Sequence, residues 1–335
     1  MRAVRLHGVG DLRVESVPEP GAPAGADALV RVLAAGICGS DLHNFRTGMW
    51  LSRAPSTPGH ELAGEVIAVG PEVRGLRVGD RVAADSRVPC GTCPMCTSGR
   101  GNLCASLGFV GEVCDGGFAE LTVLPARLLH KLPPGLDPKV AAMAEPLAVA
   151  LHAVRRLAPR KDEPVLVAGC GPIGGLVALV LAEEGCGPIL IADRQAARAS
   201  LVAGLTGARI VTLDREAVLA AASGRAVAQA VDATGSIGAL TGLLDVLGTG
   251  ARLALVGIFH GRLDLDPNRL VEREVDLVGC SAFATELPEA IARLPALAAK
   301  LTRMIEGPIA LEDMPAAYQR LIASGSDRLK TIMVP

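Results

Sequence analysis

The strongest constraint on the fold is a glycine-rich turn between a short apolar run and a helix. Residues 165–168 are typical of a buried parallel strand, and Gly169 to Gly174 follow them with the pattern Gly-x-Gly-x-x-Gly. A predicted helix runs from there to Glu184, and a second apolar run ends at Asp193. A lone glycine pattern is weak evidence. Here, however, the glycine pattern stands between a strand and a helix, and an acid ends the next strand. This order predicts a doubly wound parallel α/β sheet, the Rossmann fold, that binds a dinucleotide.

Each residue of this turn has a predicted role. Gly169 allows the tight turn, and Gly171 lets backbone amides approach a pyrophosphate at the helix N-terminus. Gly174 permits close packing of the helix on the strand. Pro172 and Ile173 lie between these glycines and complete the predicted cofactor-binding turn. The competing interpretation is a glycine-rich connection that binds no cofactor.

Asp193 is predicted to accept hydrogen bonds from the adenosine ribose hydroxyls. A carboxylate there repels a 2′-phosphate, so NAD is favoured over NADP. Arg194 could soften that preference, although such an arginine is more often solvated or stacked on the adenine. Further strands of the same sheet are expected over residues 208–211, 228–232, 252–257 and 275–279. Thr234, Gly257 and Ile258 fall at strand ends where open α/β sheets bind ligands, so we expect them at the cofactor.

Four cysteines lie in one short stretch: Cys90, Cys93, Cys96 and Cys104. Four thiolates at this spacing can close a tetrahedral zinc site that has no vacant position. Such a site performs no chemistry, so we expect it to be structural and to hold a lobe with too little apolar content to fold alone. The alternatives are four free thiols, which would be an oxidation hazard, and an iron–sulfur cluster, which uses the same ligand type.

A second metal site is predicted between residues 38 and 61. Cys38, His60 and a carboxylate, either Glu61 or one from elsewhere in the chain, supply three ligands of the open kind that catalytic zinc uses. Ser40 and His43 would then remain as a short proton path. Ligands so far apart in the sequence form a weak motif. A buried cysteine and two ordinary histidines are the competing interpretation.

Glu145 is the best placed distant carboxylate for this site. It precedes Pro146 within a helix predicted over residues 141–157. A glutamate there is often only a first-turn charge that the helix dipole favours. The third ligand is therefore Glu61 or Glu145 at this point of the argument.

Composition excludes several classes of protein. A formal net charge of −2 gives no general attraction to nucleic acid or to anionic membranes. No run reaches the ~20 apolar residues of a membrane helix. Because no apolar leader opens the chain, its nine cysteines favour a reducing, cytoplasmic location. Aromatic residues make up 2% of the chain, which predicts aliphatic cores, and short strands separated by glycine and proline predict a small barrel-like β domain before the Rossmann part.

Together these motifs resemble the zinc-containing medium-chain dehydrogenase/reductase family, and within it the polyol, butanediol, idonate and threonine dehydrogenase branch. The matching stretches are residues 36–43, 59–61, 90–104, 145–147 and 169–174, with Asp193. The resemblance implies a GroES-like β-barrel-type catalytic domain over residues 1–148, with a structural-zinc lobe near 88–106. It also implies a Rossmann NAD-binding domain over 149–284 and a C-terminal segment, 285–335, that returns to the catalytic domain. A homotetramer or homodimer is expected.

The activity implied by the resemblance is reversible hydride transfer between a secondary alcohol, diol or polyol and NAD, with one catalytic and one structural zinc per chain. In the family pattern Ser40 lies beside the substrate oxygen and His43 near the nicotinamide ribose. The pocket is bordered by the loop from Phe45 to Trp50, by Phe118 and by Ala282 and Phe283.

The last of these positions departs from the family pattern. Sorbitol-type relatives carry an Arg-Tyr pair where this chain has Ala282 and Phe283, so a smaller or more apolar alcohol is more plausible than a long polyol. An L-threonine or sugar-acid (idonate-type) dehydrogenase is an alternative. An alternative of another class is a non-catalytic nucleotide-binding protein on the same fold.

Overall fold

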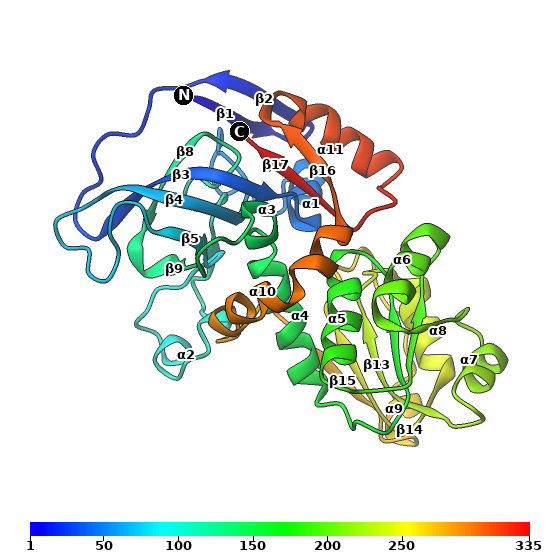
Figure 1. Ribbon diagram of the computed structural model, residues 1–335. Helices are drawn as coiled ribbons and strands as arrows, with labels where there is room; N and C mark the ends of the chain where they lie inside the picture. Colours follow the sequence, from blue (N-terminus) through cyan, green and yellow to red (C-terminus); the bar gives the residue numbers. More distant parts are fainter. The chain divides into compact units, whose positions relative to one another are not determined.

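The computed structural model describes residues 1–335, which form two compact units (Figure 1). The first, which we call the β-rich unit, comprises Met1–Glu145, Leu287–Ser326 and Lys330–Pro335. The second, the Rossmann unit, comprises Pro146–Glu286 and Asp327–Leu329. None of the helices has the length and apolar character that crossing a lipid bilayer requires.

The Rossmann unit is built on a six-stranded parallel sheet with the order β12-β11-β10-β13-β14-β15. Counted along the chain, this is the order 3-2-1-4-5-6 of dinucleotide-binding folds. The strands are β10 (Val165–Ala168), β11 (Ile189–Ala192), β12 (Arg209–Ile210), β13 (Val227–Asp232), β14 (Leu247–Leu255) and β15 (Asp276–Gly279). The helices are α4 (Ala144–Leu157), α5 (Pro172–Glu183), α6 (Ala196–Thr206), α7 (Arg215–Ala221), α8 (Ile237–Val246) and α9 (Asn268–Val271).

The β-rich unit contains a seven-stranded sheet with the order β16-β17-β3-β4-β5-β9, in which β8 also pairs with β3. Its strands are β3 (Asp27–Gly36), β4 (Glu61–Val69), β5 (Arg81–Ala84), β8 (Leu121–Pro125), β9 (Leu129–Lys131), β16 (Ile305–Ala310) and β17 (Lys330–Val334). Two small ladders pair β1 (Arg2–Gly8) with β2 (Asp11–Ser16) and β6 (Arg87–Val88) with β7 (Gly108–Phe109). The helices are α1 (Gly39–Thr47), α2 (Pro94–Thr97), α3 (Pro138–Ala141), α10 (Leu287–Met304) and α11 (Met314–Ala323).

The C-terminal segment after the long helix α10 forms β16, α11 and β17. β17 pairs antiparallel with β3, with Ile332 opposite Gly36 and Met333 opposite Ala35. The final strand of the chain therefore lies directly beside the end of β3, from which the Cys38 segment starts.

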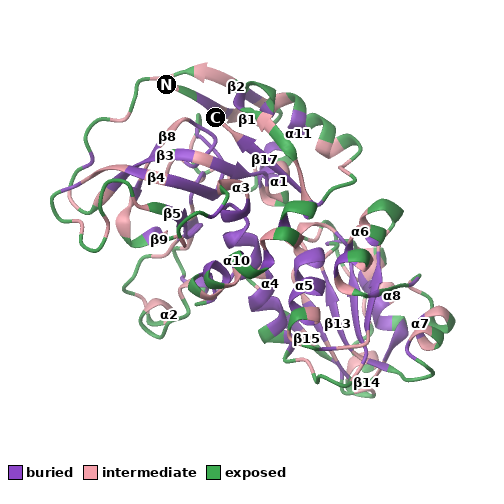
Figure 2. Ribbon diagram, viewed as in Figure 1, coloured by how far each residue is buried: buried purple, intermediate pink, exposed green.

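The cores of the two units differ in composition. The buried residues of the main hydrophobic cluster at the Rossmann sheet are all aliphatic, in agreement with the low aromatic content, although Phe283 is buried elsewhere in that unit. The expectation fails in the β-rich unit, where Phe45, Phe118 and Tyr318 are buried together. The Tyr318 ring meets those of Phe45 and Phe118 edge-on, at centroid distances of 5.6 Å and 6.4 Å. A low aromatic content of the whole chain does not predict the composition of each core, because a few aromatic residues can cluster in one of them. Figure 2 shows the buried strands and helices of both units.

Candidate functional site: two metal-binding clusters and a dinucleotide turn

Cys38 occupies the N-cap of α1, directly after the strand that ends at Gly36. Its backbone N–H donates to Oδ2 of Asp41 over 2.8 Å, which fixes the first turn of the helix. Ser40 and His43 lie three residues apart on α1, so they share one face. The His43 ring is buried and its centroid lies 4.7 Å from that of Trp50.

The segment predicted as a loop from Phe45 is partly helical. α1 continues to Thr47, and the left-handed Gly48 ends it. The Phe45 side chain is buried against Tyr318, so its ring belongs to the core and anchors α1. Only residues 48–50 of the predicted loop lie outside the helix.

Cys38, His60 and Glu61 converge on one point. One donor atom from each lies within 4.8 Å of the other two. The β3–β4 ladder explains this, because it pairs Gly36 with Glu61 and so carries the segment after β3 to the residues that open β4. A thiolate, an imidazole and a carboxylate are zinc donors, and three protein ligands leave a coordination position open. The residues present therefore fit a catalytic zinc ion.

The surroundings of His60 favour a cation. Nδ1 of His60 lies 3.6 Å from Oδ1 of the buried Asp41. This separation is an ion-pair contact, longer than a hydrogen bond, and it places a negative charge beside the His60 ring. Burial opposes a charged His60 ring, but the negative charges of Asp41 and Cys38 outweigh it and raise the pKa of His60 well above its usual value. Buried negative charge of this kind is costly unless a cation balances it.

Glu61 is also held by a lysine from the far end of the chain. Lys330, the first residue of β17, donates through Nζ to the Glu61 carboxylate and to the backbone oxygen of Ile37, the latter over 2.9 Å. Glu61 is 1% exposed and Lys330 2%. A side chain at Gly36 would collide with both the Glu61 carboxylate and the Lys330 chain, so this close approach requires glycine at position 36.

Glu145 lies outside the cluster of donor atoms. Its Oε1 accepts a hydrogen bond from the Ser86 hydroxyl over 2.7 Å, and its side chain is buried. Burial and the negative charge of Glu61 raise the pKa of Glu145 to about 7, although the charge of His60 acts in the opposite direction. Of the two candidate carboxylates, the structure groups Glu61 with Cys38 and His60.

The four-cysteine stretch forms a second cluster, in which the sulfurs of Cys90, Cys93, Cys96 and Cys104 lie within 4.8 Å of one another. Zinc at about 2.3 Å from each sulfur of a tetrahedron places the sulfurs about 3.8 Å apart. The observed separations are 3.9 Å between Cys90 and Cys96 and 3.5 Å between Cys93 and Cys96. Hydrogen bonds from the backbone of Thr92 and Cys93 lower the pKa of Cys90 to about 6, which favours the thiolate. This cluster fits a structural zinc ion.

The glycine turn connects β10 to α5. Gly169 has a positive φ of 93°, and a side chain at Gly174 would collide with the Gly169 carbonyl. A side chain at Gly171 would meet no protein atom within 4 Å, so the space beside its backbone is open. Pro172 is the first residue of α5 and Ile173 the second. The backbone amides at this end of α5 can therefore face a phosphate group.

Asp193 is fixed at the end of β11. Its carboxylate accepts hydrogen bonds from the backbone N–H of Cys170 over 2.6 Å and of Gln195 over 2.7 Å. Asp193 therefore holds the glycine turn in place, a role that the sequence did not suggest. Arg194 is exposed. Its effect on cofactor choice stays a prediction.

The remaining predicted positions fall in the Rossmann unit. Thr234 donates through its N–H and its hydroxyl to Oδ1 of Asp232 at the end of β13. A side chain at Gly235 would collide with the backbone of Ile258, so the two loops after β13 and β14 pack together around Gly257. Ala282 has a positive φ of 47° and Phe283 is completely buried, as is Phe118 in the β-rich unit. Their contact with a substrate stays a prediction.

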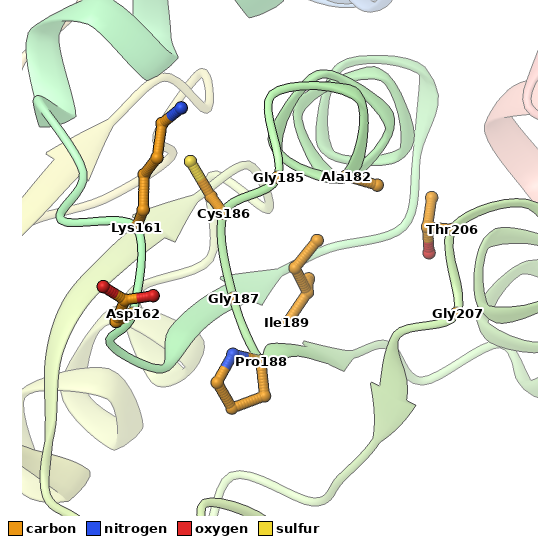
Figure 3. Close-up of a pocket in the computed structure, with 10 residues that line it drawn as sticks. All are labelled: Lys161, Asp162, Ala182, Gly185, Cys186, Gly187, Pro188, Ile189, Thr206 and Gly207. Carbon is orange, nitrogen blue, oxygen red and sulfur yellow. The ribbon is translucent and has the colours of Figure 1, made fainter.

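A pocket of about 350 Å³ in the Rossmann unit lies away from the glycine turn (Figure 3). Its walls include Lys161, Cys186, the Gly187–Pro188 peptide and Ile189 at the start of β11. Parallel α/β sheets bind ligands beyond the carboxyl ends of their strands, and this pocket lies at an amino end. It is therefore distinct from the predicted cofactor site.

Sequence reasoning missed three residues of the Cys38 site: Asp41, Ser86 and Lys330. Asp41 had a detectable signal, since an acid three residues after a helix-capping position is common at helix starts. Lys330 had one too, because a charged residue just before the apolar run 332–334 needs a partner if the run is buried. Ser86 had none, because only the fold brings it to Glu145.

Comparison with known proteins agrees with this geometry. The family model described as "Alcohol dehydrogenase GroES-like domain" matches residues 24–134, and that described as "Zinc-binding dehydrogenase" matches residues 172–296. The chain is 34% identical to L-galactonate-5-dehydrogenase of Escherichia coli K12, over 93% of this chain and 92% of the relative. It is 29% identical to sorbitol dehydrogenase of Bacillus subtilis 168, over 100% of this chain and 97% of the relative.

Solved structures resemble the whole chain. A zinc-binding dehydrogenase from Sinorhizobium meliloti 1021, bound to NADP, has a TM-score of 0.92 at 28% identity, and 2R,3R-butanediol dehydrogenase from Bacillus subtilis has one of 0.88 at 29% identity. Each match covers 100% of this chain and 99% of the other. With its GroES-like and Rossmann parts and its two zinc-type clusters, the chain belongs to the zinc-containing medium-chain dehydrogenase family, in the branch of the polyol and threonine dehydrogenases.

Proposed function

We propose that the protein is an NAD-dependent zinc alcohol dehydrogenase that interconverts a secondary alcohol, diol or polyol with its ketone. The observation that carries this proposal is the convergence of Cys38, His60 and Glu61, in a chain that also has the Rossmann turn ending at Asp193. The alcohol loses a hydride from its carbinol carbon to the nicotinamide and a proton from its oxygen, which gives ketone, NADH and a proton.

The metal, the cofactor and the protein would each have a separate role. Zinc supplies Lewis-acid activation of the alcohol oxygen, and NAD supplies the hydride acceptor. Cys38, His60 and Glu61 would hold the metal, and Asp41 keeps the His60 ring in one orientation. This chain's contribution to the rate is then position and electrostatics.

Glu61 is our proposed third ligand. It lies within the donor cluster, whereas Glu145 is hydrogen-bonded to Ser86 outside it. Lys330 would share the Glu61 carboxylate with the metal and limit how far Glu61 can move. Glu145 then remains as a buried acid beside the metal site.

The proton path would use the face of α1. Ser40 would accept the proton of the alcohol first, and His43 would then take it up. The spacing of Ser40 and His43 on one turn of helix supports this order. His43 is held by the Trp50 ring and by Thr47, whose hydroxyl lies 3.4 Å from its Nε2.

Cofactor choice is proposed to depend on Asp193. Replacing Asp193→Asn removes the charge but keeps only one of the two oxygens that accept from the backbone amides of Cys170 and Gln195, so thermal unfolding is measured alongside to show that the variant is folded. We expect the ratio of kcat/KM for NADP over NAD to rise about tenfold, a change worth about 1.4 kcal/mol. An unchanged ratio in a folded variant would remove Asp193 from cofactor selection.

The decisive experiment is a panel of secondary alcohols, diols and polyols assayed with NAD, before and after treatment with a zinc chelator. Chelator-sensitive formation of NADH, with about two zinc ions per chain by metal analysis, is expected. Nucleotide binding without turnover of any alcohol would favour a non-catalytic protein. L-Threonine and sugar acids belong in the panel, because similar proteins include an L-threonine 3-dehydrogenase and an L-galactonate-5-dehydrogenase.

Self-association is the last part of this proposal. We expect a homotetramer or a homodimer, and β15 is an edge strand of its sheet with unpaired backbone groups along one side. Light scattering after size-exclusion chromatography would distinguish these states from a monomer.

A further inference from the structure

Met49 is the most exposed methionine of the chain. It is 65% exposed, whereas the other six methionines are buried or partly buried. A single exposed apolar side chain is ordinary in a folded protein. A methionine, however, carries a thioether, and oxidants in solution convert an accessible thioether to a sulfoxide. The surroundings of the Met49 sulfur decide whether such a reaction affects the protein.

The sulfur of Met49 lies beside the ring of His43. Its Sδ is 3.4 Å from Nε2 of His43, and Oγ1 of Thr47 is 3.4 Å from the same nitrogen. The Thr47 hydroxyl donates its hydrogen to the backbone oxygen of His43 over 2.9 Å, so its oxygen can only accept at Nε2. The thioether sulfur is also an acceptor, although a weak one. Nε2 therefore carries a hydrogen and faces two acceptors.

The loop that follows α1 keeps the sulfur in this position. The backbone N–H of Met49 donates to Oγ1 of Thr47 over 3.2 Å. The next N–H, that of Trp50, donates to Oδ1 of Asn44 over 2.9 Å. Both hydrogen bonds tie the loop back to the helix that carries His43. An exposed thioether is thus fixed against a buried histidine of the proposed proton path.

Oxidation would change the acceptor that Nε2 faces. When hydrogen peroxide reacts, a lone pair of the sulfur forms the S–O bond, the O–O bond breaks, and the other oxygen leaves as water with both hydrogens. The thioether is oxidised to the sulfoxide and the peroxide is reduced. The new oxygen is bonded to a sulfur that already lies 3.4 Å from Nε2, so it can accept the hydrogen bond. Oxidation turns the flexible apolar side chain into a polar one.

A stronger acceptor at Nε2 acts on the step in which His43 releases its proton. In the proposed path His43 takes up and releases one proton in each turnover. Hydrogen bonds from a charged donor are stronger than those from a neutral one, so the sulfoxide favours the protonated ring. Release of the proton then becomes slower. The effect falls on kcat more than on KM.

We propose that Met49 is a modification site, at which a peroxide oxidises the thioether to the sulfoxide and so slows turnover through His43. This inference rests on the proposed function and assigns a form of regulation to the same site. Methionine sulfoxide reductases reverse the modification, because they return the sulfoxide to the thioether.

The test treats zinc-loaded wild type with hydrogen peroxide and measures kcat and KM with NAD and the alcohol that is oxidised best. Peptide mass spectrometry gives the fraction of Met49 sulfoxide. Met49→Leu has a similar volume and cannot form a sulfoxide, and Met95→Leu in the four-cysteine lobe is the matched control. Each variant is compared with its own untreated sample. Oxidation of the zinc-binding cysteines, followed by zinc content, is common to all three proteins.

We expect kcat of wild type and of Met95→Leu to fall about tenfold as the Met49 sulfoxide forms, as one added hydrogen bond to a charged group predicts. Treatment with methionine sulfoxide reductases for both epimers should restore kcat. Met49→Leu should lose far less of its own untreated kcat. Met49→Gln, which places an amide oxygen near the sulfoxide position, should turn over more slowly than Met49→Leu without any oxidant.

Several results would overturn the inference and leave the proposed function intact. These are an equal loss of kcat in wild type and Met49→Leu, a Met49 sulfoxide that forms without loss of kcat, and a Met49 that stays unoxidised while Met95 reacts. Equal turnover of Met49→Gln and Met49→Leu, or a change in KM alone, would also contradict an effect through His43. If untreated, zinc-loaded wild type oxidised no alcohol, the proposed function itself would fail.

Discussion

The two metal-binding clusters of this protein solve the same problem in opposite ways. The four-cysteine cluster draws all its ligands from residues 90–104, in a largely exposed lobe, and stabilises its thiolates with nearby backbone N–H groups. The Cys38 cluster joins the N-cap of α1 to the residues that lead into and open β4, is mostly buried, and is charge-balanced by Lys330 from β17. A structural site can be local because it only has to be closed. A catalytic site must leave one position open, so its remaining stability and orientation come from distant parts of the fold.

The largest effect should follow removal of a ligand from the Cys38 cluster. Cys38→Ala, or His60→Ala, should lower turnover of a secondary alcohol by about 10³-fold or more, because the Lewis acid is lost or misplaced. Metal analysis should show one zinc per chain in place of two. Circular dichroism should show that the fold is intact. Near-wild-type turnover in either variant would contradict the catalytic assignment of this cluster.

The matching change in the four-cysteine cluster should act on stability. Cys93→Ser removes one ligand of a closed zinc site. The free energy of unfolding of the lobe should therefore fall by several kcal/mol, and the protein should lose its structural zinc. The readouts are Tm and zinc content. Cys280→Ser, which changes a cysteine outside both clusters, is the control. If Cys93→Ser kept wild-type stability and two zinc ions, the structural role would be wrong.

The next prediction concerns Lys330, the cation that balances the charge of the Cys38 cluster. Lys330→Met leaves the Glu61 carboxylate buried without its lysine, and loss of one partner of such a pair costs about 3–5 kcal/mol. Unfolding by urea measures this loss. The double variant Glu61→Gln/Lys330→Met should recover part of it, since no charge is then left alone. Equal losses in the single and double variants would show that the pair is not coupled.

The smallest expected effect concerns the orientation of His60. Asp41→Asn keeps the size of the side chain but weakens the interaction with Nδ1 of His60, and changes of this kind typically cost 10–100-fold in metal affinity. Competition with a chromogenic chelator measures the affinity of the Cys38 cluster, and the four-cysteine cluster serves as the internal reference. An unchanged affinity would mean that Asp41 only caps α1.

The same contrast explains how much could be predicted from the sequence. The glycine turn and the four cysteines are local patterns with fixed spacing, and the structure places both as compact local units. Cys38 and His60 could be recognised, but the choice between Glu61 and Glu145 could not, since it depends on the β3–β4 register and on Ser86. Lys330 was missed because it is 269 residues from its partner and because β17 resembles an ordinary tail. Phe45 was placed in a loop because nothing in its local sequence reveals Tyr318 as a packing partner.

The position of Lys330 has a consequence for how the protein is made. Protein synthesis adds about 5–20 residues per second, so the ribosome adds Lys330 roughly 13–54 s after Glu61. β17 can pair with β3 only after all the residues between them have been made. During translation the acidic residues of the Cys38 site are therefore present long before the lysine that balances their charge. Completion of the catalytic centre is thus a late event in the synthesis of residues 1–335.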